Sequence, residues 1–545
     1  MRPRRRRHRR RPDPPHACTL GPYRTREFAL NTTAEKLSSL AEKLDRAHSP
    51  GSERAIAKRA AAGLPGPRDR IDALLDPGSF IEYGALMRAP GSPKNPYGDG
   101  VVTGRGTVGG RPVVVYSHDN TVFGGSLGEM FGRKVVAMME LAAKTACPII
   151  GINDSGGARV QDAVTSLAFY SEIGRRQRLL SGLAPQISIM LGKCAGGAAY
   201  SPACTDFVVA VQDQSYMFVT GPDVLKAVTG EDISAEDLGG ARKQASYGTV
   251  HHVADSEADA FVWVKTLLGY LPSNCHEGAP VVNPGLEPTV TESDLSLDSF
   301  LPESDNTAYD MHDVMMKVFD DGEFLEVGAL YAPNVITAFT RVDGRTVGVV
   351  ANQPTYLSGA LDIASSEKAA RFIYICDAYA IPIVFLVDIP GYLPGLEQER
   401  AGVIYRGAKL LAAVIESTVP KVTVVIRKAY GGGYAVMGSK NLGADLNFAW
   451  PTARIAVMGA EGAVGLLKRR EIEAAGEDGP RVRQDFIDFY NEYVATPYTA
   501  AERGYIDAVI EPSQTRLDIR RALKLLADKT PEPLPPRRRS LLRPV

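Results

Sequence analysis

Short apolar runs along the chain alternate with longer segments in which apolar residues recur at helical spacing. The runs CPIIGIND, ending at Asp154, and QISIML, ending at Leu191, are rich in Ile and have the length of strands. A helical segment that starts near Lys134 leads into the first of them. Alternation of this kind predicts an α/β fold with much parallel strand pairing.

The whole arrangement occurs twice along the chain. DPGSFIEYGAL at 76–86 returns as DDGEFLEVGAL at 320–330, and GRPV at 110–113 returns as GRTV at 344–347. The strand CPIIGIND matches IPIVFLVD, which ends at Asp388, at an offset of 234 residues, and QISIML matches KVTVVI at an offset of 235. Four anchors at nearly constant offset predict two copies of one α/β domain.

The composition between and around the copies predicts the domain limits. Residues 271–308 are rich in Pro, Ser, Asn and acidic residues without a sustained period, as linkers are. A helix with a polar face is expected over 33–61, and a turn, a short strand and a closing helix are expected over 498–528. The predicted division is a disordered basic extension (1–29), an N-terminal domain (30–285), a C-terminal domain (286–530) and a disordered tail (531–545).

Charge and cysteine content narrow the class of protein. The 62 Lys and Arg nearly balance the 63 Asp and Glu, but eight Arg lie within residues 1–12, so the rest of the chain is acidic. An acidic body argues against nucleic acid as the main partner. No apolar run approaches the length of about 18 residues that a membrane span needs, and the six Cys form no C-x-x-C pair. We expect a cytoplasmic protein without a metal site.

Three motif matches have simpler explanations. GRGTVG at 104–109 fits a dinucleotide-binding pattern, but the strand RPVVVYS follows it, so a β-hairpin is expected instead. GGSLG at 124–128 fits the nucleophile elbow of a serine hydrolase, with His251 or His252 as the partner, but the second copy has SGALD at the equivalent place. VMMKV at 314–318 suggests a biotin-attachment lysine, but its apolar spacing is helical and indicates a surface lysine.

Paired glycines are the strongest sign of chemistry. Gly196-Gly197 follow the strand QISIML, and Gly431-Gly432-Gly433 follow KVTVVI. Glycine at such a point lets backbone N–H groups face a ligand without interference from a Cβ atom. Two N–H groups directed at one oxygen form an oxyanion hole. Two such pairs in a duplicated fold suggest two substrates, each with a carbonyl oxygen that gains negative charge.

Loops at the ends of the preceding strands are candidate walls of the same clefts. Asn153-Asp154-Ser155-Gly156-Gly157-Ala158-Arg159 follows one strand, and Asp388-Ile389-Pro390-Gly391-Tyr392 follows its counterpart. Ligands of open α/β sheets bind beyond the carboxyl ends of the strands. We therefore expect Gly156, Gly157, Ala158, Gly125 and Ala198 to contact one substrate.

Several longer motifs resemble the carboxyltransferase (β) subunit of biotin-dependent acyl-CoA carboxylases, most closely the propionyl-CoA carboxylase branch. The resemblance covers about residues 30–530. The motifs that carry it are PYGDGVVTG at 96–104, TVFGGSLG at 121–128, GGAAYSPA at 196–203, MFVTGPD at 217–223, SSEKAAR at 365–371 and RKAYGG at 427–432.

This resemblance implies two tandem crotonase-like domains, a ring-shaped homohexamer and active sites shared between neighbouring protomers. It implies that the N-terminal copy binds acyl-CoA and the C-terminal copy binds carboxybiotin. Gly196 and Gly197 would hold the thioester oxygen, and Gly432 and Gly433 would hold the ureido oxygen near Gly391 and Tyr392. The family usually has Gly-Ala where this chain has Gly432-Gly433, a change that keeps the backbone donors.

The resemblance also implies the reaction and its partners. Carboxyl transfer from carboxybiotin to the α carbon of an acyl-CoA would give malonyl-CoA or an alkylmalonyl-CoA, as an extender unit for polyketides or in fatty acid metabolism. The chain has no biotinyl-lysine motif and no convincing ATP-binding module, so a biotin-bearing α subunit is expected as partner.

One departure from the family bears on the substrate. Propionyl-type members usually have Asp where this chain has Ala435, beside Tyr434. We therefore expect a roomier, more apolar pocket for butyryl or longer chains. Propionyl-CoA carboxylase β itself, and a biotin-dependent decarboxylase or transcarboxylase subunit, are the main alternatives. A biotin-independent hydratase or hydrolase and a catalytically silent scaffold are the others.

Overall fold

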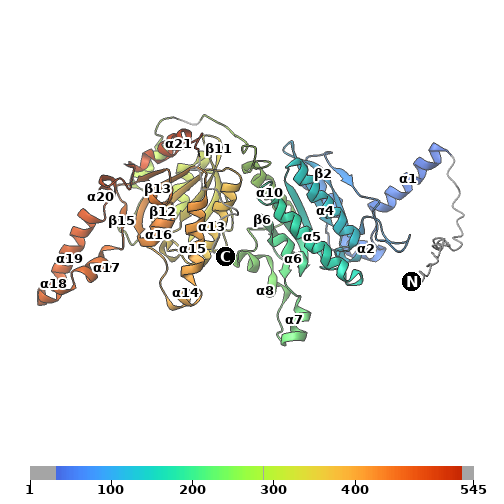
Figure 1. Cartoon of the computed structure of the whole chain (residues 1–545), viewed down its shortest axis with the longest axis horizontal. Coiled ribbons are helices and arrows are strands. Elements are labelled where there is room, and N and C mark those ends of the chain that lie inside the picture. The colour runs from blue at the N-terminus through green and yellow to red at the C-terminus, as the bar shows by residue number, and fades with distance from the viewer. Residues whose placement is uncertain (1–31, 286–287, 531–545) are drawn as a thin grey trace, which may run out of the picture.

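The computed structural model describes residues 32–285 and 288–530, which form two lobes side by side (Figure 1). Each lobe is built on an eight-stranded sheet. The strands of the N-terminal lobe are β1 (Ile81–Tyr83), β2 (Val101–Val108), β3 (Arg111–His118), β4 (Ile149–Ser155), β5 (Gln186–Ala195), β6 (Phe207–Val211), β7 (Tyr216–Phe218) and β8 (His252–Ala254). Those of the C-terminal lobe are β9 (Phe324–Glu326), β10 (Val335–Val342), β11 (Arg345–Asn352), β12 (Ile383–Ile389), β13 (Lys421–Tyr430), β14 (Leu446–Ala449), β15 (Arg454–Ala456) and β16 (Ala508–Val509).

The two sheets have the same topology. Their strand orders are β1-β2-β3-β4-β5-β6-β8 and β9-β10-β11-β12-β13-β14-β16, with β7 paired to β5 and β15 paired to β13. In each, the first three strands are antiparallel and the rest are parallel. The β2–β3 pair is the hairpin expected from the glycine pattern. The correspondence between the sheets confirms the internal duplication.

Helices cover the sheets as the apolar spacing predicts. In the N-terminal lobe, α4 and α5 pack against each other over the sheet, and α13 and α15 do the same in the C-terminal lobe (Figure 1). The helices are α1 (Thr33–His48), α2 (Glu53–Ala61), α3 (Pro67–Leu74), α4 (Glu129–Thr145), α5 (Val164–Leu180), α6 (Gly197–Ala203), α7 (Pro222–Thr229), α8 (Ala235–Gly239), α9 (Ala241–Ser246), α10 (Glu257–Tyr270), α11 (Glu292–Leu295), α12 (Met311–Val318), α13 (Ile363–Ala378), α14 (Leu396–Arg400), α15 (Val403–Glu416), α16 (Gly431–Val436), α17 (Ala460–Leu467), α18 (Arg469–Ala474), α19 (Gly479–Phe489), α20 (Pro497–Glu502) and α21 (Thr515–Leu525).

Aromatic residues join the cores of the two lobes. Phe339 on β10 is fully buried, and its ring centroid lies 6.2 Å from that of Phe207 on β6 and 4.9 Å from that of Phe372 on α13. Residues of both lobes accordingly belong to one hydrophobic cluster. The lobes are therefore packed together rather than merely tethered.

The local structure at residues 33–61 and around Lys317 tests two of the predictions made from the sequence. The helix expected over 33–61 is two helices, α1 and α2, because the segment Ser49-Pro50-Gly51-Ser52 interrupts it and Ser52 caps the second helix. Lys317 lies on α12 and donates to Ser296 Oγ at 2.8 Å, which confirms that the Met-Met-Lys segment is helical. The predictions of disorder for residues 1–29 and 531–545 concern residues outside the described ranges.

None of the described helices combines the length and apolarity needed to cross a membrane. Five cysteines lie in the described ranges, and all are free thiols. Residues 32–285 and 288–530 contain no cluster of three or more His, Cys, Asp or Glu side chains that could hold a metal ion.

We predict that Phe339→Ala removes about 3–5 kcal/mol of stability, because it leaves a cavity where the lobes meet. The measurement is the urea midpoint followed by circular dichroism. Phe489→Ala on α19 is the matched control, since Phe489 is 56% exposed and should cost less than about 0.5 kcal/mol. Equal midpoints for the two variants would contradict a shared core.

Candidate functional site: paired backbone donors in two copies

The glycine turn of the N-terminal lobe lies between β5 and α6. Gly196 has φ 57° and donates its N–H to the carbonyl oxygens of Phe218 and Val219, at 3.1 and 3.0 Å. This corrects the expectation that the Gly196 N–H faces a substrate, because it is already used to anchor the turn. The N–H groups of Gly197 and Ala198 have no acceptor among the described residues.

The loop after β4 supplies a second unused donor. Leu127 pairs with this loop: its N–H donates to Gly157 O at 2.9 Å, and its oxygen accepts from Arg159 N at 3.0 Å. Successive residues of an extended chain direct their N–H groups to opposite sides. The N–H of Ala158, between these two residues, therefore points away from Leu127, and no acceptor for it occurs in the described part of the chain.

Close backbone contacts hold the two loops together. A Cβ atom on Gly157 would lie 3.0 Å from Ala195 O, which places this loop against the end of β5. A Cβ atom on Gly125 would lie 2.4 Å from Asp154 O, and Gly156 donates to Gly124 O at 3.0 Å. The structure thus brings the expected substrate-contacting residues to one end of the sheet, with Gly125 and Gly156 fixing the backbone around Ala158.

The C-terminal lobe repeats this arrangement. Leu361 donates to Gly391 O at 3.0 Å and accepts from Leu393 N at 2.7 Å, which leaves the Tyr392 N–H without an acceptor in the described ranges. A Cβ atom on Gly433 would lie 3.0 Å from Gly391 Cα, so the turn at the start of α16 contacts this loop. The N–H of Gly432 is likewise unused by any described residue.

Each lobe therefore has unused N–H groups on two adjacent loops: those of Ala158, Gly197 and Ala198 in one lobe, and those of Tyr392 and Gly432 in the other, with Gly197 and Gly432 as counterparts. The two glycines differ in their surroundings. A Cβ atom at Gly197 would fall 2.8 Å from the Tyr170 ring, whereas a Cβ atom at Gly432 would have nothing within 4 Å. Packing alone requires glycine at 197, whereas the space in front of Gly432 is open to a ligand.

A buried ion pair clamps the loops of the N-terminal lobe. Arg159 Nη1 lies 2.7 Å from Asp99 Oδ1, and both side chains are at most 4% exposed. Arg159 Nη2 also donates to Ser126 O at 2.9 Å, and Asp99 Oδ2 accepts from the N–H of Phe131 on α4 at 2.9 Å. The pair therefore connects the loop after β4, the loop before α4 and α4 itself.

The C-terminal lobe has a neutral group at one part of this arrangement, and its side chain bonds to the segment before α13 but not to the loop after β12. Asn334 Nδ2 donates to Ala360 O at 2.7 Å, and Ala360 is the counterpart of Ser126. Sequence analysis did not identify either clamp, because the partners are far apart in sequence. Asp99 nevertheless lies inside the motif at 96–104 that carries the family resemblance, and Arg159 ends the loop segment 153–159 that was expected to line the cleft.

Buried aspartates end the strands beneath both loops. Asp154 accepts from Asn120 Nδ2 at 2.6 Å and lies 3.5 Å from Arg70 Nη1. Its counterpart Asp388 accepts from Arg427 Nε at 3.0 Å and from Lys428 N at 3.0 Å. Burial raises the pKa of both carboxyls, against the opposing effect of the arginines. These interactions hold the strand ends that precede the two loops. They do not use the free N–H groups, which remain available to a ligand.

The serine-hydrolase alternative fails on geometry. Ser126 Oγ donates to Phe123 O at 2.6 Å, and no histidine is hydrogen-bonded to it within the described chain. His251 Nδ1 instead accepts from Val208 N at 2.9 Å. The nucleophile-elbow match is a tight turn before α4.

A cavity lies directly behind the C-terminal turn. It has a volume of about 310 Å³, and its walls include Tyr434, Ala435, Leu442, Ile455 and Tyr505. The charged side chain at this cavity, Lys440, is neutralised by Asp507 at 2.6 Å. Burial raises the pKa of Tyr434 to about 12, so the wall is uncharged at neutral pH.

The cavity beside the N-terminal turn, lined by Tyr170 and Ala198, is smaller. It measures about 20 Å³, room for about one water molecule. The cavity beside Ala435 is large enough for an apolar group of several carbons.

The chain is a duplicated α/β protein with unused backbone N–H groups on paired loops of each lobe, an arrangement that can stabilise an oxyanion. The carboxyl transferase domain family matches residues 59–542. The chain is 62% identical over 503 residues to the biotin-dependent long chain acyl-coenzyme A carboxylase β4 subunit of Mycobacterium tuberculosis, covering 92% of this chain and 96% of that one. It is 55% identical over 516 residues to the propionyl-CoA carboxylase β chain of Saccharopolyspora erythraea, covering 92% and 94%.

Among solved structures, the transcarboxylase 12S hexamer with methylmalonyl-coenzyme A bound superposes with a TM-score of 0.90 at 45% identity, covering 94% of this chain and 98% of that one. The chain therefore belongs to the carboxyl transferase family, as a carboxyltransferase subunit of the biotin-dependent acyl-CoA carboxylase type.

We predict that the two clamps serve different substrates. Asp99→Asn removes the nearer and more buried of the two carboxylates that pair with Arg159, leaving Asp162 at 3.7 Å. It should displace Ala158 and lower kcat/KM about 10- to 100-fold for one of the two substrates. Asn334→Ala is the matched change in the other lobe and should affect the second substrate instead. Steady-state kinetics with each substrate varied in turn makes the comparison. Equal effects of both variants on both substrates would rule out separate sites.

Proposed function

We propose that this protein transfers a carboxyl group from carboxybiotin to the α carbon of acyl-CoA thioesters longer than propionyl-CoA, giving alkylmalonyl-CoA products. The observation that carries the choice of chain length is the apolar cavity beside Ala435. The acceptor carbon must meet the carboxyl donor, so the acyl chain lies next to the donor site. The relative in M. tuberculosis, named for long-chain acyl-CoA, supports the same substrate class.

The two lobes take the two substrates in this proposal. The N-terminal domain, residues 30–285, binds the acyl-CoA, with its thioester oxygen accepting from the N–H groups of Ala158 and Gly197. These donors stabilise the negative charge that develops on the oxygen when the α proton leaves, and each is worth roughly 10²–10³ in rate. Fixed backbone donors give this stabilisation without reorganising during the reaction.

The C-terminal domain, residues 286–530, holds the biotin. The residues present fit a cyclic urea: Tyr392 and Gly432 offer free N–H groups, and side-chain positions at Gly391 and Gly432 are open, with nothing within 4 Å. Bound biotin supplies the carboxyl group and the base for the α proton. The role of this lobe is to hold the ureido oxygen and to keep water from the transfer.

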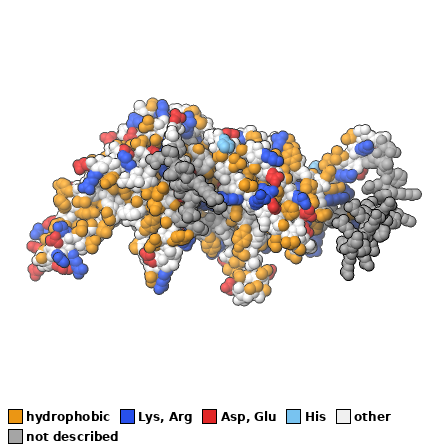
Figure 2. Space-filling view, in the orientation of Figure 1, with side chains coloured by type: hydrophobic (Ala, Val, Ile, Leu, Met, Phe, Trp, Pro, Cys, Tyr) orange, Lys and Arg blue, Asp and Glu red, His pale blue; other side chains and the backbone are white. Residues whose placement is uncertain are grey.

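The biotin is carried by a separate α subunit, and the catalytic unit is a hexamer in this proposal. Apolar side chains are spread over the visible face of both lobes (Figure 2). Val164 and Leu167 on α5 are 73% and 60% exposed, and Ile404 on α15 is 81% exposed. Apolar residues exposed on helices near both sites indicate surfaces that a neighbouring subunit covers. The similar transcarboxylase 12S structure is a hexamer assembly.

A cytoplasmic location completes the proposal. Cys147, Cys194 and Cys376 are buried as free thiols, as in proteins of reducing compartments.

The test is ATP- and bicarbonate-dependent carboxylation with a biotinylated α subunit, across acetyl-, propionyl-, butyryl-, hexanoyl- and octanoyl-CoA. The proposal predicts kcat/KM rising beyond propionyl-CoA. An optimum at propionyl-CoA would overturn the chain-length assignment, and no activity on any thioester would overturn the function.

We predict that Ala435→Asp reverses the preference for long chains, because it places a carboxylate in the apolar cavity. Each buried methylene is worth about 0.8 kcal/mol, close to fourfold in affinity. The octanoyl to propionyl ratio of kcat/KM should therefore fall at least tenfold. Ala435→Ser is the control for size and should change the ratio far less. An unchanged ratio in Ala435→Asp would show that the chain lies elsewhere.

A further inference from the structure

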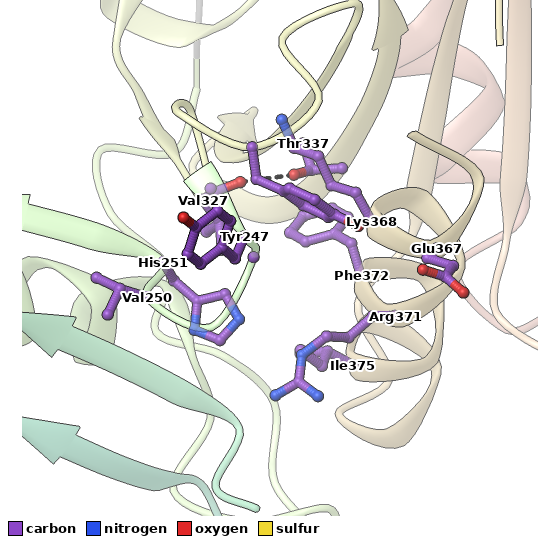
Figure 3. A pocket seen from close by; sticks show the side chains of 13 residues that line it. Tyr247, Val250, His251, Val327, Thr337, Glu367, Lys368, Arg371, Phe372 and Ile375 are labelled. Carbon is purple, nitrogen blue, oxygen red and sulfur yellow. Dashed lines mark hydrogen bonds between the residues drawn. The ribbon is translucent and has the colours of Figure 1, made fainter. Parts of the chain in front are cut away.

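A second cavity lies between the two lobes, away from both glycine turns, and is called the interdomain pocket here (Figure 3). It has a volume of about 250 Å³. The N-terminal lobe contributes residues 247–251 and the C-terminal lobe contributes Val327 and the face of α13. None of the proposed oxyanion donors lines it. The carboxyl transferase reaction therefore does not account for it.

His251 offers one hydrogen-bond donor to the interdomain pocket. Its Nδ1 accepts from Val208 N at 2.9 Å, so the neutral ring carries its proton on Nε2. Burial lowers the pKa of His251 to about 3, and the nearby charge of Arg371 adds to this effect. The ring is therefore neutral at physiological pH and can donate a hydrogen bond without being charged.

Arg371 supplies the positive charge. Its Nη2 donates to Thr205 O at 2.8 Å and to Asp206 O at 3.0 Å, while Nε and Nη1 have no acceptor among the described residues. Figure 3 shows the guanidinium directed to the same side as His251, with the Glu367 carboxylate turned away. Glu367 is bound to Arg406 at 2.8 Å and Lys409 at 2.9 Å. The buried Asp206 carboxylate is the acidic group whose charge acts on Arg371, but it accepts from Gln186 N and from the Tyr379 hydroxyl, both at 2.9 Å, and forms no ion pair with Arg371 in the described ranges.

The fold does not require an arginine at this position. The N-terminal lobe has Ala137 at the equivalent place on α4. Lys368, by contrast, has a counterpart in Lys134, and each is buried and bonds to backbone carbonyls of its own lobe. Lys368 is therefore structural, and Arg371 is specific to the interdomain pocket.

We propose that the interdomain pocket binds a medium-chain carboxylate. The carboxylate would accept from Arg371 and His251, and the chain would lie against Val250, Phe372 and Ile375. A cavity of about 150 Å³ takes a benzene ring, so this volume takes about ten non-hydrogen atoms, as in octanoate. A free carboxylate fits this pocket because its one charged group can accept hydrogen bonds from Arg371 and His251, and its alkyl chain can pack against the apolar side chains.

The experiment is isothermal titration of the full-chain protein with octanoate and with 1-octanol. The proposal predicts saturable binding of one octanoate per chain, and binding of octanol at least tenfold weaker. Arg371→Gln should weaken octanoate binding at least tenfold. Arg469→Gln is the matched control: it also removes one positive charge, but from α18, where Arg469 is exposed and pairs with Glu473 away from the pocket wall, and should leave the affinity unchanged.

Ile375→Trp tests the same pocket without touching the charge, because the larger ring fills the space and should abolish binding. Circular dichroism shows that each variant is folded. Absence of saturable octanoate binding to the native protein would overturn the proposal, as would equal affinities of Arg371→Gln and Arg469→Gln. Loss of octanoate binding in Ala435→Asp instead would assign the ligand to the acyl cavity and overturn it too. Because the readout is binding, it is independent of carboxylation activity.

Discussion

The free N–H groups of both lobes depend on one backbone pairing, in which a leucine before a helix bonds to the loop after the neighbouring strand. Leu127 donates to Gly157 O and accepts from the N–H of Arg159, and Leu361 pairs in the same way on either side of Tyr392. The residue between the two paired ones must then direct its N–H away from the leucine. The proposed oxyanion sites of the two lobes therefore rest on the same duplicated pairing.

The two lobes differ in the surroundings of their free N–H groups. In the N-terminal lobe, Gly197 packs against Tyr170, and the adjacent cavity has room for about one water molecule. In the C-terminal lobe, no atom lies within 4 Å of a Cβ position at Gly432, and a cavity of about 310 Å³ lies beside Ala435. The clamps differ as well, with a buried ion pair at Asp99 in one lobe and the neutral Asn334 in the other. Duplication kept the backbone donors and changed the side chains around them.

Much of this could be predicted from the sequence because repeats and glycine positions are local signals. The offset of 234 residues predicted two equivalent domains, and the glycines after β5 and β13 marked the turns. What could not be predicted depends on partners distant in sequence. The bonds from the Gly196 N–H to Phe218 O and Val219 O leave Gly197 as the available donor of the two expected glycines, and the Asp99–Arg159 pair joins residues 60 positions apart. The interdomain pocket depends on the packing of whole lobes, which no local pattern encodes.

The central claim is that free N–H groups of the N-terminal lobe polarise the thioester carbonyl. Infrared difference spectroscopy of bound octanoyl-CoA, labelled with ¹³C at the carbonyl, measures this directly. The account predicts a carbonyl band at lower frequency than for the thioester in water, and the same shift in Gly432→Pro, whose lost N–H belongs to the other lobe. A band at the solution frequency, with the ligand shown to be bound, would contradict it.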